Sequence, residues 1–411
     1  MAACAWQYAG MDLVNVDRIL AARDLLADVV RRTPVEQARD LRRLHGGEVH
    51  LKCENLQRTG SFKIRGAYVR IHGLTPEERA RGVVAASAGN HAQGVALAAS
   101  LLDTKATVFM PERAALPKLA ATKGYGAEVH LRGGVLTETL AAAREFAQRT
   151  GAVFIHPFDH ADIIAGQGTV GLEILEQVPE VATIVVAAGG GGLAGGVAAA
   201  VKALNPAVRV VAVQADGAAA FPPSLRAGEP VHLDVQHTMA DGIAVGAPGP
   251  VSYVHVAELV DEVVTVSEES LSRAVLQCVE RRKLVVEPAG AASVAALMQY
   301  PGNFATPVVG VLSGGNVDPL LLLQIIQHGM TAAGRYLALH LRLPDTPGSL
   351  ASLLTKVGEL GANVIDVEHS RISGALALGE VDVSLNLETR GPEHCGEIRK
   401  ALREFWIPGP L

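Results

Sequence analysis

The chain has 411 residues, of which 49% are apolar, 4% aromatic and 19% charged, and its formal net charge is −6. This length allows more than one domain with a sizeable core, and the acidic balance gives no electrostatic basis for binding nucleic acid. A composition dominated by Ala, Val, Leu and Gly, with 43 glycines, is more typical of parallel strands packed between helices than of a β-sandwich.

Targeting and redox signals favour a cytoplasmic protein. The four cysteines, Cys4, Cys53, Cys278 and Cys395, are far apart and form no CxxC pair, which argues against a disulfide framework and a zinc site. Residues 1–11 lack the basic start of a signal peptide, so we expect them to be an N-terminal extension, with Met11 as an alternative start. No apolar run reaches the roughly 18 residues that a membrane span requires.

From about residue 50 to residue 330, short Val- and Ile-rich runs alternate with alanine-rich helical segments. The predicted strands are "GVVAAS", "KATVFM", "AEVHL", "AVFIHPF", "TIVVAA", "RVVAVQA", "EVVTVS" and "PVVGVLSGG". Strand, Gly-rich turn and helix repeated in this way predict βαβ units and a doubly wound, mostly parallel α/β sheet. Such folds bind ligands at the carboxyl ends of their strands.

After the break around Gly334 the pattern changes. The segments "YLALHLRL", "PGSLASLLTKVGELG", "NVIDVEHSRI", "LALGEVDVSLNLE" and "EHCGEIRKALREF" predict strand, helix, strand, strand and helix in that order. Residues 336–411 are therefore expected to form a small, separate α+β domain.

The stretch "TGSFKIRGA" places Lys63 in the first turn of a predicted helix, with Ser61 as its expected cap. The positive end of the helix dipole disfavours an ammonium there by roughly 0.3–1 kcal/mol. Burial adds to that effect, and both bias the side chain toward the neutral, nucleophilic amine. The alternative is a solvent-exposed lysine paired with a nearby acid.

The stretch "GGGGLAGG", which starts at Gly189, separates a predicted strand from a predicted helix. Consecutive glycines let backbone N–H groups converge at a helix start, which is a site for a phosphate. Gly190, Gly192 and Gly195 also satisfy G-x-G-x-x-G, so a dinucleotide is an alternative, although the next strand ends in Gln214 where an acid is wanted.

Two further turns lie at strand ends. "SAGNHAQG" exposes backbone N–H groups at a helix start, which suits a substrate carboxylate, and Asn90 can hydrogen-bond a ring hydroxyl. In "LSGGNVDP", Ser313 ends a buried strand and offers a neutral hydroxyl. Each of these features is often only a turn, but their shared position at the strand ends of one sheet predicts a common site.

The motifs "ENLQRTGSFKIRGA", "SAGNHAQG", "GGGGL", "EPAGA" and "SGGN" occur in the order found in pyridoxal-phosphate enzymes of the tryptophan-synthase-β type. The chain most resembles the threonine dehydratases (threonine ammonia-lyases) with a C-terminal ACT-like domain. This resemblance implies two doubly wound, mostly parallel sheets (the type II fold) in a catalytic domain over residues 12–335, with a small subdomain inserted at about 55–158, and an ACT-like, ferredoxin-type regulatory domain over 336–411.

The resemblance also implies roles for single residues. Lys63 would hold pyridoxal 5′-phosphate as a Schiff base and then act as the general base, Phe62 would lie beside the ring, and Ser313 would face the pyridine nitrogen. The phosphate would be held by the backbone of Gly189, Gly190, Gly191, Gly192 and Leu193. Asn90 would contact the ring oxygen, and the substrate would bind along Ser87, Ala88, Gly89, Asn90 and His91.

A serine opposite the pyridine nitrogen makes the ring a weaker electron sink than a carboxylate would, which favours loss of a β-leaving group. The implied reaction is α,β-elimination of L-threonine to 2-oxobutanoate and ammonia, and of L-serine to pyruvate. In the serine racemases of this fold a serine serves as a second base where this chain has Ala88, so dehydration is expected to dominate over racemisation.

No metal site is expected. Gln214, Ala218 and Ala220 stand where relatives that bind a divalent cation have acidic ligands, and "HPFDHAD" lacks the spacing of a zinc motif. Phe158 of that segment is expected to border the substrate pocket. Glu287 either lies close to the cofactor's face or caps the helix that follows it.

The tail resembles ACT domains through "DTPGSLASLLTKVGELGANVIDVEHSR", which implies an effector site at Gly348 and Asn363. Isoleucine and an adenine nucleotide are the leading candidate effectors, and a plain dimerisation module is the alternative. The family implies a homotetramer or a dimer. The usual final strand is absent or stunted in "FWIPGPL". Two functions of other classes stay open beside the lyase: a dinucleotide-dependent oxidoreductase and a catalytically idle amino-acid sensor.

Overall fold

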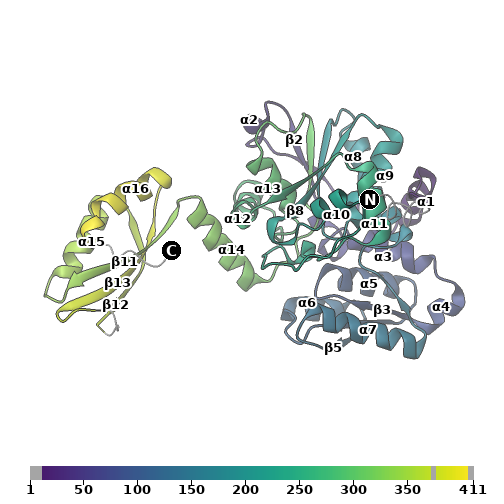
Figure 1. The fold of residues 1–411 in the computed structure, drawn as a ribbon, viewed down its shortest axis with the longest axis horizontal. Helices are drawn as coiled ribbons and strands as arrows, with labels where there is room; N and C mark the ends of the chain where they lie inside the picture. The colour runs from purple at the N-terminus through teal and green to yellow at the C-terminus, as the bar shows by residue number, and fades with distance from the viewer. Residues whose placement is uncertain (1–11, 372–375, 406–411) are drawn as a thin grey trace. The chain divides into compact units, whose positions relative to one another are not determined.

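The computed structural model describes residues 12–371 and 376–405, so the expected extension at 1–11 and the chain end at 406–411 lie outside the described residues. The chain divides into two compact units, Met1–Leu322 and Leu323–Leu411. Helix α14 (Pro319–Ala332) runs across the point of division (Figure 1).

The first unit contains a six-stranded sheet in the order β1-β2-β10-β7-β8-β9. Every neighbouring pair is parallel except β1 and β2, which are antiparallel. The interior strands are buried on both faces, as their continuous Val, Ile and Ala runs predict. The strands of this sheet are β1 (Val35–Gln37), β2 (Val49–Lys52), β7 (Thr183–Ala187), β8 (Arg209–Ala215), β9 (Glu262–Val266) and β10 (Val308–Val311).

A four-stranded, fully parallel sheet in the order β5-β4-β3-β6 forms a second subdomain of the same unit. Its strands are β3 (Val83–Ala86), β4 (Ala106–Met110), β5 (Glu128–Leu131) and β6 (Val153–Phe154). All four lie inside the segment 55–158 that was expected to form an inserted subdomain. The predicted fold class, two doubly wound and mostly parallel sheets, is confirmed.

Helices cover the sheets of the first unit, and α8 packs against both α3 and α9 (Figure 1). Small residues allow the close approach: a Cβ on Gly166 of α8 would meet the backbone of Gly66 in α3. The helices are α1 (Val16–Leu26), α2 (Arg42–His45), α3 (Lys63–His72), α4 (Pro76–Arg81), α5 (Asn90–Leu101), α6 (Leu116–Gly124), α7 (Leu136–Thr150), α8 (Ala161–Gln177), α9 (Gly192–Leu204), α10 (Phe221–Ala227), α11 (Pro250–Leu259), α12 (Glu268–Gln277) and α13 (Ala292–Gln299).

The second unit has the predicted β-α-β-β-α order. Its antiparallel sheet runs β11-β13-β12, and the alternate Val and Leu side chains of β11 and β13 form its core with the helices. The elements are β11 (Tyr336–Pro344), α15 (Ser349–Glu359), β12 (Asn363–Ser370), β13 (Glu380–Glu388) and α16 (Pro392–Ala401).

Within residues 12–371 and 376–405, no helix is both long enough and apolar enough to cross a bilayer.

Candidate active site

Lys63 is the first residue of α3, as predicted, but Ser61 does not cap this helix. Ser61 is extended and pairs with Gly314 through the backbone, and Phe62 takes the N-cap position without a side-chain hydrogen bond. The Ser61 hydroxyl is therefore buried without a hydrogen-bond partner in the described part of the chain. The prediction of a serine cap was wrong because Phe62, which has helical backbone angles, takes the N-cap position and leaves Ser61 one residue outside it.

A cavity of about 830 Å³ lies at the strand ends of the first unit. It contains every residue expected to bind the cofactor or the substrate: Phe62, Lys63, Ser87, Ala88, Gly89, Asn90, His91, Gly189, Gly190, Gly191, Gly192, Leu193 and Ser313. These residues come from segments up to 251 positions apart, since Phe62 and Ser313 line the same space. Phe158 also lines it, as expected.

The glycine turn is shaped by close approach to Phe158. A Cβ on Gly190 would overlap the Phe158 ring, and one on Gly192 would lie 2.7 Å from the Phe158 carbonyl oxygen. Gly191 has a φ of +98°, a conformation that side chains rarely adopt. Because α9 starts at Gly192, the N–H groups of this turn lie at the positive end of a 13-residue helix, which favours an anion.

The Ser87–His91 turn joins β3 to α5. Ser87 Oγ accepts a hydrogen bond from the Gly89 N–H at 3.1 Å, which stabilises the turn. The His91 ring bonds the Ile155 carbonyl at 2.8 Å and is 4% exposed. Burial and the nearby Lys63 charge lower the His91 pKa to about 3, so this ring is neutral at physiological pH.

The Lys63 amine lies inside the cavity and donates to the Pro157 carbonyl at 2.9 Å. The expected alternative, a lysine paired with an acid in solvent, is therefore wrong. Burial lowers the Lys63 pKa to about 8, and the negative charge of Glu287 opposes this shift. At a pH near this pKa, a substantial fraction of the Lys63 amine is neutral, as a nucleophile or base requires.

Glu287 lines the same cavity with a side chain that is only 3% exposed. Its Oε1 accepts a hydrogen bond from Asn90 Nδ2 at 2.5 Å. Helix α13 begins five residues later with Ala291 as an uncapped N-cap, so the alternative that Glu287 caps this helix was wrong. Burial and the charge of Asp241 raise the Glu287 pKa to about 7.

A buried charge cluster anchors α3 two residues beyond Lys63. Arg65 is fully buried and pairs with Glu54 at 2.8 Å and with Glu173 of α8 at 2.7 Å. Lys52 of β2, also fully buried, pairs with Glu173 at 2.5 Å. The cluster connects β2, the segment before α3, α3 and α8, so it fixes the position from which Lys63 enters the cavity.

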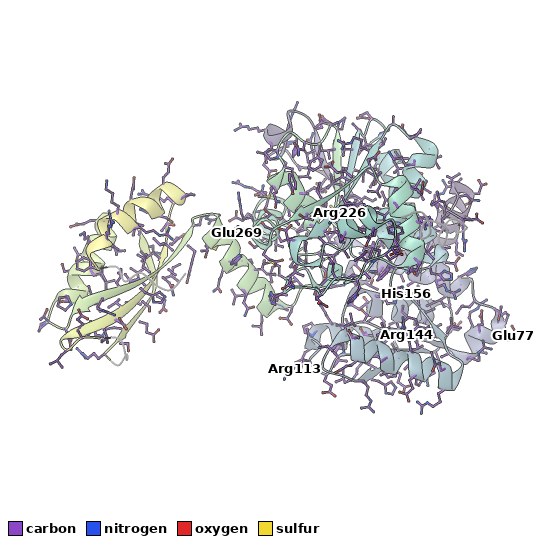
Figure 2. All side chains as sticks on the ribbon, in the orientation of Figure 1. Glu77, Arg113, Arg144, His156, Arg226 and Glu269 are labelled. Carbon is purple, nitrogen blue, oxygen red and sulfur yellow. The ribbon has the colours of Figure 1, made fainter. Side chains whose placement is uncertain are left out.

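Sequence reasoning missed several groups that line the cavity. Lys118 of α6 reaches across to Asp241 at 3.0 Å and so joins the two subdomains at the cavity. The loop from His232 to Gly246 forms one wall. Figure 2 labels His156, which was considered from the sequence only as part of a metal motif and which also lines the cavity. Lys118 and the loop belong to no recognised motif, so only their position in the fold identifies them as cavity residues.

The histidines of "HPFDHAD" accept hydrogen bonds from backbone N–H groups of the same segment. His156 Nδ1 accepts from the Asp159 N–H at 2.8 Å, and His160 Nδ1 caps α8 by accepting from the Asp162 N–H at 3.1 Å. Asp162 pairs with Arg18 at 2.5 Å. Among the residues that the structure describes, no three His, Cys, Asp or Glu side chains gather as a metal site.

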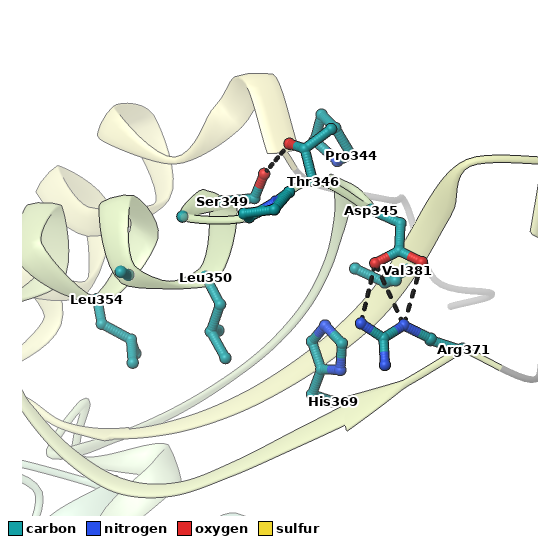
Figure 3. A pocket seen from close by; sticks show the side chains of 12 residues that line it. Pro344, Asp345, Thr346, Ser349, Leu350, Leu354, His369, Arg371 and Val381 are labelled. Carbon is teal, nitrogen blue, oxygen red and sulfur yellow. Dashed lines mark hydrogen bonds and ion pairs between the residues drawn. The ribbon is translucent and has the colours of Figure 1, made fainter.

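The second unit has its own cavity of about 650 Å³ at the start of α15 (Figure 3). Gly348 lines it, as do Leu350, His369 and the ion pair of Asp345 with Arg371 at 3.1 Å. Asn363 does not line it; its amide donates to Glu388 at 3.4 Å. The structure therefore brings only one of the two expected effector residues to this cavity.

Comparison with known proteins shows what the chain is similar to. The family model described as "Pyridoxal-phosphate dependent enzyme" matches residues 26–314. An L-threonine ammonia-lyase of Thermotoga maritima is 45% identical over 390 residues, which cover 95% of this chain and 97% of that protein. The catabolic L-threonine dehydratase TdcB of Escherichia coli is 42% identical over 310 residues, 74% of this chain and 94% of that protein.

Solved structures give the same picture. Maize serine racemase superposes with a TM-score of 0.72 at 37% identity, covering 76% of this chain and 97% of that chain. The processed form of threonine deaminase isoform 2 from Solanum lycopersicum superposes with a TM-score of 0.73 at 34% identity, covering 80% of this chain and 90% of that chain. The chain belongs to the family of pyridoxal-phosphate dependent enzymes.

Proposed function

We propose that this chain converts L-threonine to 2-oxobutanoate and ammonia, and L-serine to pyruvate and ammonia. Water leaves in the α,β-elimination and is taken up again when the released imine hydrolyses, so the net loss is ammonia alone. The observation that carries the proposal is the meeting of the Lys63 amine and the four-glycine turn in one cavity. The relatives named L-threonine ammonia-lyase, which share 45% identity over nearly the whole chain, support this substrate.

The cavity fits pyridoxal phosphate. The turn Gly189–Leu193 presents backbone N–H groups at the start of α9, where they suit a phosphate, and Lys63 offers an amine of lowered pKa. Lys63 is the residue we propose to hold the cofactor covalently, with Phe62 beside the ring, Asn90 at its oxygen and Ser313 at its nitrogen. The bound group supplies an electron-withdrawing ring that makes the substrate Cα–H acidic.

Lys63 then moves the proton. Once free, its amine accepts the proton from Cα as the general base, a role that contributes about 10²- to 10⁴-fold in rate. The substrate carboxylate binds the backbone N–H groups of Ser87–His91 at the start of α5. Ala88 lines the cavity and has no group that exchanges a proton, which favours elimination over racemisation.

The oxidoreductase alternative finds no support in the strand that follows the glycine turn. Gln214 at the end of β8 accepts from the Phe221 N–H at 2.9 Å and donates to the Ala218 carbonyl at 3.3 Å. Its amide is therefore committed to its own loop instead of being free for a ribose.

The second unit is proposed to regulate the first. Residues 336–411 would form an ACT-like domain that binds an amino acid such as isoleucine, or an adenine nucleotide, at the cavity next to Gly348. The exposed pair of Asp345 and Arg371 offers charges of both signs to such a ligand. We further propose a catalytic domain over 12–335, a homotetramer or dimer, and a cytoplasmic setting, which the buried free thiols of Cys53, Cys278 and Cys395 support.

The test is an assay of 2-oxobutanoate release from threonine, with added pyridoxal phosphate and with or without isoleucine or AMP. Borohydride treatment followed by peptide mapping should find the cofactor on the peptide that contains Lys63. Absence of oxo-acid release, despite cofactor bound to Lys63, would favour the idle-sensor alternative.

A further inference from the structure

Three side chains form a chain of hydrogen bonds along one wall of the cavity. Asn316 Nδ2 donates to the Thr59 carbonyl at 2.6 Å and to Asn90 Oδ1 at 2.7 Å. Asn90 Nδ2 donates to Glu287 Oε1 at 2.5 Å. The three side chains come from the segments after β10, at the start of α5 and before α13.

The direction of each hydrogen bond in this series follows from the groups at its two ends, the Thr59 carbonyl and the Glu287 carboxylate. A backbone carbonyl accepts only, so the Asn316 group that meets Thr59 must be its NH₂. The second hydrogen of that NH₂ can then meet only an oxygen, which places Oδ1 of Asn90 toward Asn316. The NH₂ of Asn90 consequently lies toward Glu287, whose ionised carboxylate also accepts only. Among the residues that the structure describes, the other N–H of Asn90 has no acceptor.

Two glycines make room for the side chains of Glu287 and Asn316, the outer members of this hydrogen-bond series. A Cβ on Gly314 would overlap Glu287 Oε1, and a Cβ on Gly60 would overlap Asn316 Oδ1. Their positions explain why "TGSF" and "SGGN" carry a glycine next to the functional segment: the side chains of Glu287 and Asn316 occupy the space that a Cβ would need.

We propose that Asn316 and Glu287 are positioning residues that lock the Asn90 amide in one orientation, with its unused N–H available to the ring oxygen of the bound cofactor. This inference rests on the proposed function, since it takes the cavity to be the pyridoxal-phosphate site. A reversed amide would present a carbonyl oxygen to the ring oxygen, and two acceptors repel each other.

The charges around Glu287 are compatible with this role. Lys63 of α3 and Lys118 of α6 favour its ionised form, as does the Asn90 hydrogen bond, whereas Asp241 and burial oppose it. The wall therefore holds a carboxyl whose pKa is raised to about 7, and the ionised form is the better acceptor for Asn90.

The test uses Asn316→Asp, which keeps the shape of the side chain and removes its donors. The new carboxylate accepts from Asn90 Nδ2 and so turns the amide around, which leaves the Asn90 oxygen facing Glu287. We expect a lower melting temperature for the full chain without cofactor. We also expect the dissociation constant for pyridoxal phosphate, measured by absorbance titration, to rise about tenfold.

The double variant Asn316→Asp, Glu287→Gln separates positioning from stability. The glutamine NH₂ can donate to the reversed Asn90 oxygen, so the melting temperature should recover toward that of the wild type. Cofactor affinity should stay weak because the amide still points the wrong way.

Asn55→Asp is the matched control. Asn55 is 7% exposed and donates to the Val285 carbonyl at 3.1 Å but does not touch Asn90. This variant should melt earlier and bind the cofactor as the wild type does. The positioning role would be overturned if Asn316→Asp bound the cofactor as tightly as the wild type does. It would also be overturned if the double variant recovered both the melting temperature and the cofactor affinity. In either case, threonine elimination by the wild-type chain would still uphold the proposed function. Failure of the wild-type chain to bind pyridoxal phosphate would overturn both.

Discussion

The two units use charge in opposite ways. In the first, Arg65 of α3, the helix that carries Lys63, is fully buried and pairs with the fully buried Glu54. In the second, Arg371 and Asp345 have 67% and 36% of their side-chain surfaces exposed. A buried pair cannot exchange partners without a large desolvation cost, whereas an exposed pair interacts weakly and can open. The comparison teaches that the buried pair holds α3 in place, whereas the exposed pair is free to change partners.

Lys63→Ala should give the largest effect, because we propose Lys63 as both the covalent attachment point and the base. We expect the rate of 2-oxobutanoate release to fall by at least about 10²- to 10⁴-fold. The measurement is a coupled assay of the oxo acid. Lys105→Ala, at an exposed lysine (71% of the side chain) paired with Glu128, is the control and should retain full activity.

Arg65→Met should destabilise the first unit by about 3–5 kcal/mol, because Glu54 is left as an uncompensated buried charge. Denaturant unfolding followed by fluorescence would measure this. The matched control is Arg209→Met, which breaks the exposed pair with Glu262 and should cost less than about 1 kcal/mol. Equal losses in the two variants would contradict the contrast between buried and exposed charge.

Glu287 should make stability depend on pH. Its pKa is raised from 4.5 to about 7 in the folded chain. As the pH rises, the unfolded chain therefore loses this proton at a lower pH than the folded chain does. The contribution of protonated Glu287 to the free energy of unfolding is fully present below pH 4.5. It falls by roughly 3 kcal/mol as the pH rises toward 7. Glu287→Gln should therefore gain stability relative to the wild type between pH 4.5 and 7, as urea unfolding at several pH values would show. A constant difference across that range would refute the raised pKa.

Arg371→Met should have the smallest effect on the fold, because an exposed ion pair contributes little to the free energy of unfolding. Its effect should appear in regulation: the isoleucine or AMP concentration that gives half of the response should rise by about tenfold, the scale of one charged hydrogen bond. Titration of the threonine reaction would measure it. An unchanged response would remove the tail cavity as the effector site.

The predicted helices and strands were largely confirmed because hydrophobic periodicity and Gly-rich turns act locally. The strands "GVVAAS" and "TIVVAA" correspond to β3 and β7, and Lys63 lies in the first turn of α3. The serine cap was wrong because Phe62 takes the N-cap position, and Ser61, bridged to Gly314 through the backbone, lies one residue outside it. Glu287 could be assigned only from the fold, because its partner Asn90 is 197 residues away.

The sequence by itself determined the parallel α/β architecture, the family, and the types of residue at each strand end, because these depend on local pattern and on motifs. The tertiary structure decided which groups meet. It brought Lys63, the glycine turn, Asn90 and Glu287 into one cavity, shifted the pKa values there, and gave Asn90 its two partners. Burial and distance set those properties, and neither exists until the sheets assemble.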